Sequence, residues 1–200
     1  PNPNPQIIIT LIKLLFFINK LNHIININYQ VNIYISKMLE QKKMAATNRI
    51  QEEFRDLNAN PEKNIGATVG LIDNDLFQWR ATITGPNDTP YKNGLFRLKI
   101  SFPDDYPNTK PEVVFETPIY HVNVNPSPDY GQILGHVCIS TLNNWKKESK
   151  IREVLIDIFA LFYMANLSSS YDEGASYEMR NNPELHKEKV KYITKKYANP

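Results

Sequence analysis

Cys138 is the only cysteine among the 200 residues of the chain and the first candidate for covalent chemistry. Asn123 precedes it by 15 positions, and His121 forms a His-x-Asn pair with that asparagine. A lone cysteine with histidine and asparagine elsewhere in the chain is a candidate nucleophile, because a thiolate attacks acyl carbons. The presence of one cysteine, taken by itself, favours the interpretation as an inert buried thiol over that as a nucleophile. The segment from Gly135 to Trp145 has no helical apolar repeat, which predicts that extended or loop backbone presents Cys138.

Composition excludes several other classes of function. One cysteine allows neither an intramolecular disulfide nor a cysteine-based zinc site, and it fits a reducing compartment. The four histidines (His23, His121, His136 and His186) have no metal-ligand spacing, so we expect no metal or cofactor. The net charge of +2 is too small to argue for nucleic acid, and no glycine-rich phosphate loop is present.

Residues 1–43 differ from the rest of the chain and are interpreted as a low-complexity extension rich in Ile and Asn, either disordered or not native to the protein. The apolar run over residues 7–25 is interrupted by Lys13 and Lys20. These interruptions argue against a membrane span, and the rival interpretation is an enzyme tethered to a membrane through residues 7–25. Met38 or Met44 is the expected natural start, and residues 44–200 are assigned to a single domain.

Three segments are predicted to be helical. Residues 47–58 place Ile50, Phe54 and Leu57 on one face, with Asn48 as the predicted N-cap. Residues 151–165 carry a broad apolar stripe typical of a core helix. A polar loop is expected to follow, and Asn182-Pro183 has the pattern of a last helix start.

Alternating apolar and polar residues predict a sheet between these helices. Phe77 to Ile83 and Leu98 to Phe102 have the period of half-buried strands, and residues 111–115 form a further short strand. Turn residues separate the runs at hairpin spacing, which predicts an antiparallel meander. We therefore expect an α+β fold with an N-terminal helix, a four-stranded antiparallel meander, an active-site loop and C-terminal helices.

Several motifs occur in a characteristic order. They are Gly85-Pro-x-Asp-Thr-Pro-Tyr, Phe102-Pro-x-x-Tyr-Pro, Pro111-x-Val-x-Phe, Tyr120-His-x-Asn and Gly135-x-Val-Cys-Ile-Ser. Together they resemble the catalytic domain of ubiquitin-conjugating enzymes, and the resemblance covers roughly residues 47–199. Several motifs in order are a far stronger signal than any one of them.

The resemblance implies an acyl-transfer function. Cys138 would accept ubiquitin or a ubiquitin-like modifier as a thioester from an activating enzyme and pass it to a substrate lysine, usually with a ligase. Asn123 would donate to the oxyanion or hold the loop, and His121 would be structural. The alternative is a catalytically idle scaffold that binds proteins of the pathway. A cytoplasmic or nuclear location is expected, with neither nucleic acid nor membrane as a partner.

The resemblance also implies a gate for the incoming lysine and a surface for the ligase. The gate position falls on Ser169, and Asp172 is the rival carboxylate. The ligase-contact candidates are Arg49, Asn108, Lys146 and Lys147.

The chain departs from the family at several of these positions. Asn108 replaces a large apolar residue that ligase-binding members often carry, and Lys146-Lys147-Glu148 replaces the usual second ligase loop. Val122 stands where the family has proline, and the segment from Asn123 to Cys138 is longer than usual.

Overall fold

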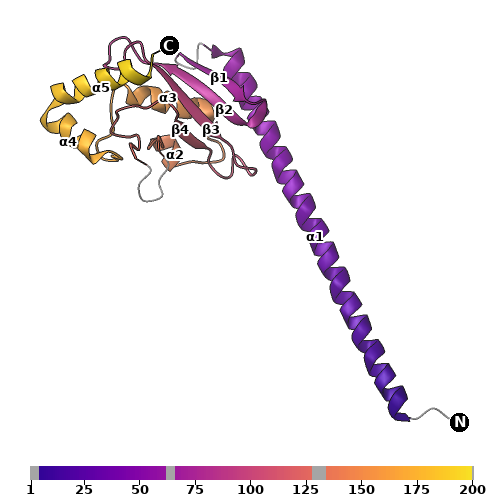
Figure 1. Cartoon of the computed structure of the whole chain (residues 1–200). Coiled ribbons are helices and arrows are strands. Elements are labelled where there is room, and N and C mark those ends of the chain that lie inside the picture. Colours follow the sequence, from indigo (N-terminus) through magenta and orange to yellow (C-terminus); the bar gives the residue numbers. More distant parts are fainter. Residues whose placement is uncertain (1–4, 62–65, 128–133, 200) are drawn as a thin grey trace. The chain divides into compact units, whose positions relative to one another are not determined.

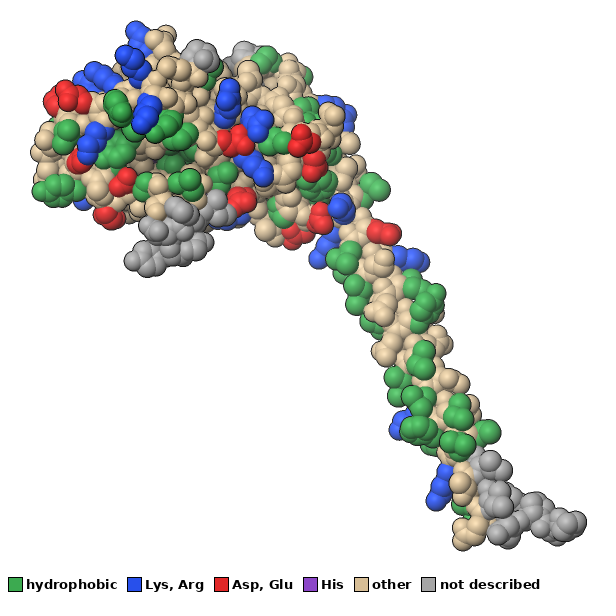
Figure 2. All heavy atoms as spheres, in the orientation of Figure 1, with side chains coloured by type: hydrophobic (Ala, Val, Ile, Leu, Met, Phe, Trp, Pro, Cys, Tyr) green, Lys and Arg blue, Asp and Glu red, His purple; other side chains and the backbone are tan. Residues whose placement is uncertain are grey.

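A computed structural model describes residues 5–61, 66–127 and 134–199 of the chain. Two compact units are present, Pro1–Met44 and Ala45–Pro200. The first unit is helical from Pro5, as part of helix α1 (Pro5–Ala59). Apolar side chains such as Leu15, Phe16 and Phe17 are exposed along it (Figure 2). No helix within the described residues is both long enough and apolar enough to span a membrane.

Helix α1 does not begin at the predicted N-cap. Asn48 lies inside the helix, so the prediction of a start at Asn48 is wrong. The residues directly before it, Met38 to Ala46, are mostly strong helix formers such as Leu, Glu, Gln, Lys and Ala, so nothing ends the helix there. The predicted end at residue 58 is confirmed to within one residue, because α1 stops at Ala59, before Asn60-Pro61.

The predicted meander is confirmed. Its strands are β1 (Ala67–Ile72), β2 (Asp75–Thr84), β3 (Leu95–Ser101) and β4 (Glu112–Phe115), all antiparallel in the order β1-β2-β3-β4 (Figure 1). Asp73 and Asn74 connect β1 to β2 with positive φ angles of 51° and 58°. Two such residues in a row are typical of the tight turn whose twist matches that of the flanking strands.

Within the described part of the chain, four further helices follow the sheet: α2 (Ser140–Asn143), α3 (Ile151–Leu161), α4 (Glu173–Asn181) and α5 (Pro183–Tyr197). Helix α3 is four residues shorter than the predicted 151–165. Helix α4 was not predicted, because its sequence carries no strong apolar stripe. The predicted start of α5 is confirmed, since the Asn182 side chain accepts a hydrogen bond from the Leu185 amide.

The core lies between the sheet and the helices. Trp79 of β2 is fully buried, and its ring contacts those of Phe54 at 5.2 Å and Phe102 at 4.6 Å between centroids. Ile50 and Leu57 from α1 and a set of α3 residues (Ile151, Val154, Leu155 and Ile158) are buried in the same cluster. The second unit therefore has one continuous core.

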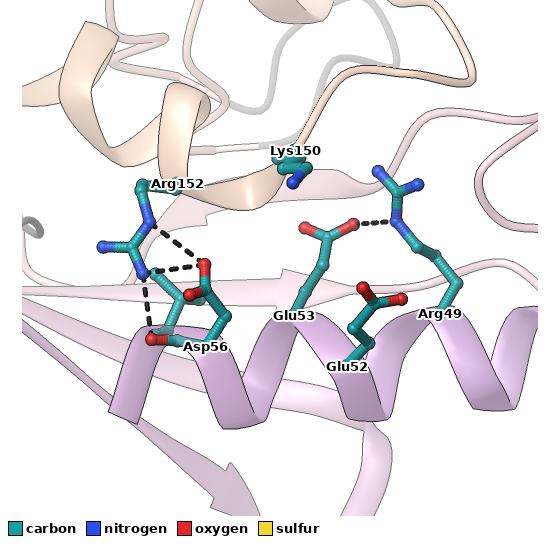
Figure 3. A pocket seen from close by; sticks show the side chains of 7 residues that line it. Arg49, Glu52, Glu53, Asp56, Lys150 and Arg152 are labelled. Atoms are coloured by element: carbon teal, nitrogen blue, oxygen red, sulfur yellow. Dashed lines mark hydrogen bonds and ion pairs between the residues drawn. The ribbon is translucent and has the colours of Figure 1, made fainter. Parts of the chain in front are cut away.

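Glu53 is a buried carboxylate that connects three parts of this unit. It accepts hydrogen bonds from the Tyr106 hydroxyl at 2.7 Å and from the Ile151 amide at 2.8 Å, and it pairs with Arg49. These contacts join α1 to the loop after β3 and to the first residue of α3. Figure 3 shows Glu53 and Arg49 lining one side of a pocket of about 250 Å³.

Arg152 makes a second connection between α3 and α1. Its guanidinium donates to the Asp56 carboxylate and to the Asp56 carbonyl, both at 2.9 Å (Figure 3). A cation at the C-terminal end of a helix also compensates the partial negative charge of the helix dipole. The end of α1 is thus held at both Glu53 and Asp56.

Replacement of Glu53 tests the importance of this network. Glu53→Ala leaves the Tyr106 hydroxyl, the Ile151 amide and the Arg49 charge without their acceptor, so we expect a loss of about 3–5 kcal/mol in the free energy of unfolding. Urea denaturation of the full chain measures it. The control is Glu52→Ala, an exposed neighbour, with an expected change within about 0.5 kcal/mol. Equal losses in the two variants would contradict a special role for Glu53.

Candidate active site

Cys138 lies on an extended segment that pairs with the chain around Asn123. Val137 and Val124 form an antiparallel bridge, and the Cys138 amide donates to the Asn123 carbonyl at 2.9 Å. Cys138 is half-buried and forms no disulfide, as expected for a thiol presented on extended or loop backbone. Gly135 has a φ of 78°, and a Cβ there would lie 2.3 Å from the Phe115 carbonyl oxygen. Only glycine allows the segment to approach β4 this closely.

The longer connection between Asn123 and Cys138 does not separate these two residues. The Asn125 amide donates to the His136 carbonyl, and the Gly135 amide donates to the Asn125 carbonyl, both at 2.9 Å. These bonds close the base of the connection. Its central residues, 128–133, lie outside the described part of the chain.

The Asn123 side chain is fully buried and holds the loop that follows α3. Its Nδ2 donates to the carbonyls of Asn166 at 2.8 Å and Ser169 at 2.7 Å, and its Oδ1 accepts from the Asn166 amide at 2.8 Å. Both amide hydrogens are therefore used by backbone carbonyls. These contacts hold the loop at Asn166 and Ser169, which is one of the two roles that the resemblance implies for Asn123.

His121 is a neutral histidine held between backbone groups. Its Nδ1 accepts from the Asn123 amide at 2.9 Å, which leaves the proton on Nε2 to donate to the Leu161 carbonyl at 3.0 Å. Burial lowers the pKa of His121 to about 4. Val122, which stands where the family has proline, accepts from the amides of Tyr171 and Asp172 through its carbonyl.

The two gate candidates have different surroundings. The Ser169 hydroxyl lies 2.9 Å from the Cys138 sulfur. The Asp172 carboxylate caps α4 instead, where it accepts from the Ala175 amide at 2.8 Å. The structure therefore brings Ser169, and not the Asp172 carboxylate, into contact with the thiol.

Three residues near Cys138 were missed in the sequence. Asn143 donates its side-chain amide to the Cys138 sulfur at 3.2 Å, and the His136 Nδ1 lies 2.9 Å from the Tyr171 hydroxyl. The spacing offered a signal. His136 precedes Cys138 by two residues, and Ser169 precedes Tyr171 by two residues. The His136–Tyr171 contact and the Cys138–Ser169 contact therefore join the same two segments.

Two titratable side chains near the thiol have shifted pKa values. Burial first, and the charge of a Cys138 thiolate second, raise the pKa of Tyr171. Burial first, and the Lys110 ammonium second, lower the pKa of His136. Among the described residues no cluster of three or more His, Cys, Asp or Glu side chains is able to hold a metal ion.

Three of the four ligase-contact candidates lie on two loops that contact one another. The Trp145 indole donates to the Pro107 carbonyl at 2.8 Å, which brings the loop of Asn108 beside that of Lys146 and Lys147. Arg49 donates to the Ser149 carbonyl at 2.9 Å and joins α1 to the same region. Asn108 and both lysines are exposed.

The structure combines a four-stranded antiparallel meander with an extended cysteine segment whose sulfur lies beside a hydroxyl and a side-chain amide. The family model described as ubiquitin-conjugating enzyme matches residues 49–194. The chain belongs to the ubiquitin-conjugating enzyme family. Its structure is similar to the E2 domain of a ubiquitin-conjugating enzyme of Toxoplasma gondii, with a TM-score of 0.67 and 28% identity over 76% of this chain and 98% of that one.

The low pKa of His121 predicts a pH dependence of stability. The folded pKa of about 4 lies below the ordinary value of 6.5, so the unfolded chain binds a proton that the folded chain excludes. The free energy of unfolding should therefore be fully present above about pH 6.5 and fall by about 3 kcal/mol as the pH is lowered to about 4.

Urea denaturation between pH 7 and pH 4 measures this loss. His121→Gln should show a shallower dependence, although the lowered pKa values of His136 and His186 leave part of it in place. Parallel curves for the two proteins would contradict the assignment to His121.

Proposed function

We propose that the chain is an active ubiquitin-conjugating enzyme that carries ubiquitin or a ubiquitin-like modifier as a thioester on Cys138 and transfers it to a lysine amine. One observation carries the proposal. The sulfur of the half-buried Cys138 lies within hydrogen-bonding distance of both a hydroxyl and a side-chain amide. An idle buried thiol has no need of such groups, whereas a thiolate that leaves an acyl carbon is stabilised by them.

Transfer follows from the bonds that form and break. The lysine nitrogen bonds to the thioester carbon, the carbonyl oxygen takes up negative charge, and the carbon–sulfur bond then breaks with its electron pair returning to the Cys138 sulfur. The amine proton passes to water. The Ser169 hydroxyl, 2.9 Å from the sulfur, is placed to orient the amine but cannot act as a charged base.

The partners belong to the same proposal. They are the modifier, its activating enzyme, a ligase and substrate proteins, in the cytoplasm or nucleus. The exposed Asn108, Lys146 and Lys147 are the surface proposed for the ligase. Because this surface departs from the family pattern, the second candidate function is an idle scaffold that binds pathway proteins without accepting a modifier.

Charging of Cys138 distinguishes the two functions. Full-length chain is incubated with activating enzyme, ATP and ubiquitin or one of its relatives, and the products are run on gels with and without thiol reductant. We expect an adduct that thiol reductant cleaves, that disappears in Cys138→Ala, and that resists the thiol in Cys138→Ser, because a thiol displaces the sulfur of a thioester far faster than the oxygen of an ester. No adduct with any modifier would favour the scaffold.

The gate assignment predicts a separate effect on discharge. Ser169→Ala should charge normally but pass the modifier to free lysine about 10-fold more slowly, because the amine loses an orienting group. Asp172→Asn, which keeps a helix-capping side chain, should discharge at the wild-type rate. Single-turnover discharge of the thioester measures both. If only Asp172→Asn is slow, Asp172 is the gate.

A further inference from the structure

Asn143 presents an amide directly to the reacting atom of the site. Its Nδ2 donates to the Cys138 sulfur at 3.2 Å, and among the described residues this sulfur is the one acceptor of that amide nitrogen. Asn143 is the last residue of α2, and its own backbone amide donates to the Ile139 carbonyl at 3.0 Å. One helical turn therefore folds the side chain back onto the cysteine five residues earlier.

The turn that carries Asn143 is held firmly in place. The Asp157 carboxylate of α3 accepts from the Thr141 amide at 3.0 Å and from its hydroxyl at 2.6 Å. The Lys110 ammonium donates to the Leu142 carbonyl at 3.2 Å, and the Leu142 side chain is buried. Groups fixed in this way stabilise charge without reorganising during the reaction.

The asparagine expected to serve the oxyanion is already occupied. Both hydrogens of the Asn123 amide are given to the carbonyls of Asn166 and Ser169, deep in the protein. To donate to a reacting carbonyl, Asn123 would have to release the loop that presents Ser169. Asn143 requires no such rearrangement, because its side chain is exposed and already at the sulfur.

We propose that Asn143 is a catalytic residue of the transfer reaction, and that its amide stabilises first the oxyanion and then the departing Cys138 thiolate. Both atoms are bonded to the same thioester carbon, so a donor at the sulfur reaches the neighbouring oxygen by a small side-chain rotation. This inference rests on the proposed function, because it assigns a role within that transfer.

Substitution of Asn143 tests the proposal in single-turnover discharge. The pre-charged full-length chain is mixed with increasing concentrations of free lysine. In Asn143→Ala and Asn143→Asp the maximal rate should fall about 10- to 100-fold, because each loses the amide donor. The lysine concentration at half-maximal rate should stay unchanged, because Asn143 is assigned to charge stabilisation and not to amine binding.

Asn144→Ala is the matched control. Asn144 is the next residue, and its side chain donates to the Ser140 carbonyl instead of the sulfur. It should discharge at the wild-type rate. Thermal unfolding of all variants excludes a folding defect, since Asn143 is exposed and its loss should move the midpoint no more than the loss of Asn144 does.

Two outcomes would overturn the proposal: wild-type discharge by both Asn143 variants, or a loss of rate that Asn144→Ala shares. Failure of the wild-type chain to charge would instead reject the proposed function. The rate at which iodoacetamide alkylates Cys138 then still tests the contact between Asn143 and the sulfur, because alkylation needs no modifier. Asn143→Ala should react several-fold more slowly than wild type, and an unchanged rate would mean that the amide does not stabilise the thiolate.

Discussion

The buried amide of Asn123 is the constraint on which the rest of the site depends. The backbone carbonyl of Asn123 accepts a hydrogen bond from the Cys138 amide. The Asn123 side chain exchanges hydrogen bonds with the backbone of the loop at Asn166 and Ser169. One residue therefore fixes the position of the cysteine relative to the loop that faces it. Because the group is fully buried, a lost partner leaves an unsatisfied polar atom, so the two segments are held together.

The order of elements in the second unit could largely be predicted from sequence, because each element has a local signal. Alternation marks β2 and β3, Asn60-Pro61 ends α1, and Asn182 caps α5. The start of α1 was predicted wrongly, because a possible cap at Asn48 does not end a helix whose preceding residues also favour helix. Helix α4 was missed because its sequence carries no strong apolar stripe, and Asp172, whose side chain caps it, was considered only as a gate candidate.

The site itself was predictable only where a motif carried the information. Motif order pointed to Cys138 and Asn123, and the resemblance placed the gate position on Ser169; these three residues lie together in the structure. The contacts of Asn143 and of the His136–Tyr171 pair depend on how α2 and the loop after α3 fold against the cysteine segment. The equal spacing of His136 and Cys138 and of Ser169 and Tyr171 becomes a signal only once the two segments are known to pair, so neither contact was predicted from the sequence.

Two backbone hydrogen bonds close the base of the connection between Asn125 and Gly135, so the geometry of the site does not depend on the length of that connection. The hydrogen bonds from the Asn125 amide to the His136 carbonyl and from the Gly135 amide to the Asn125 carbonyl fix where the segment that leads to Cys138 begins. A connection with more or fewer residues could be closed by the same two bonds, so the reacting groups would keep their geometry.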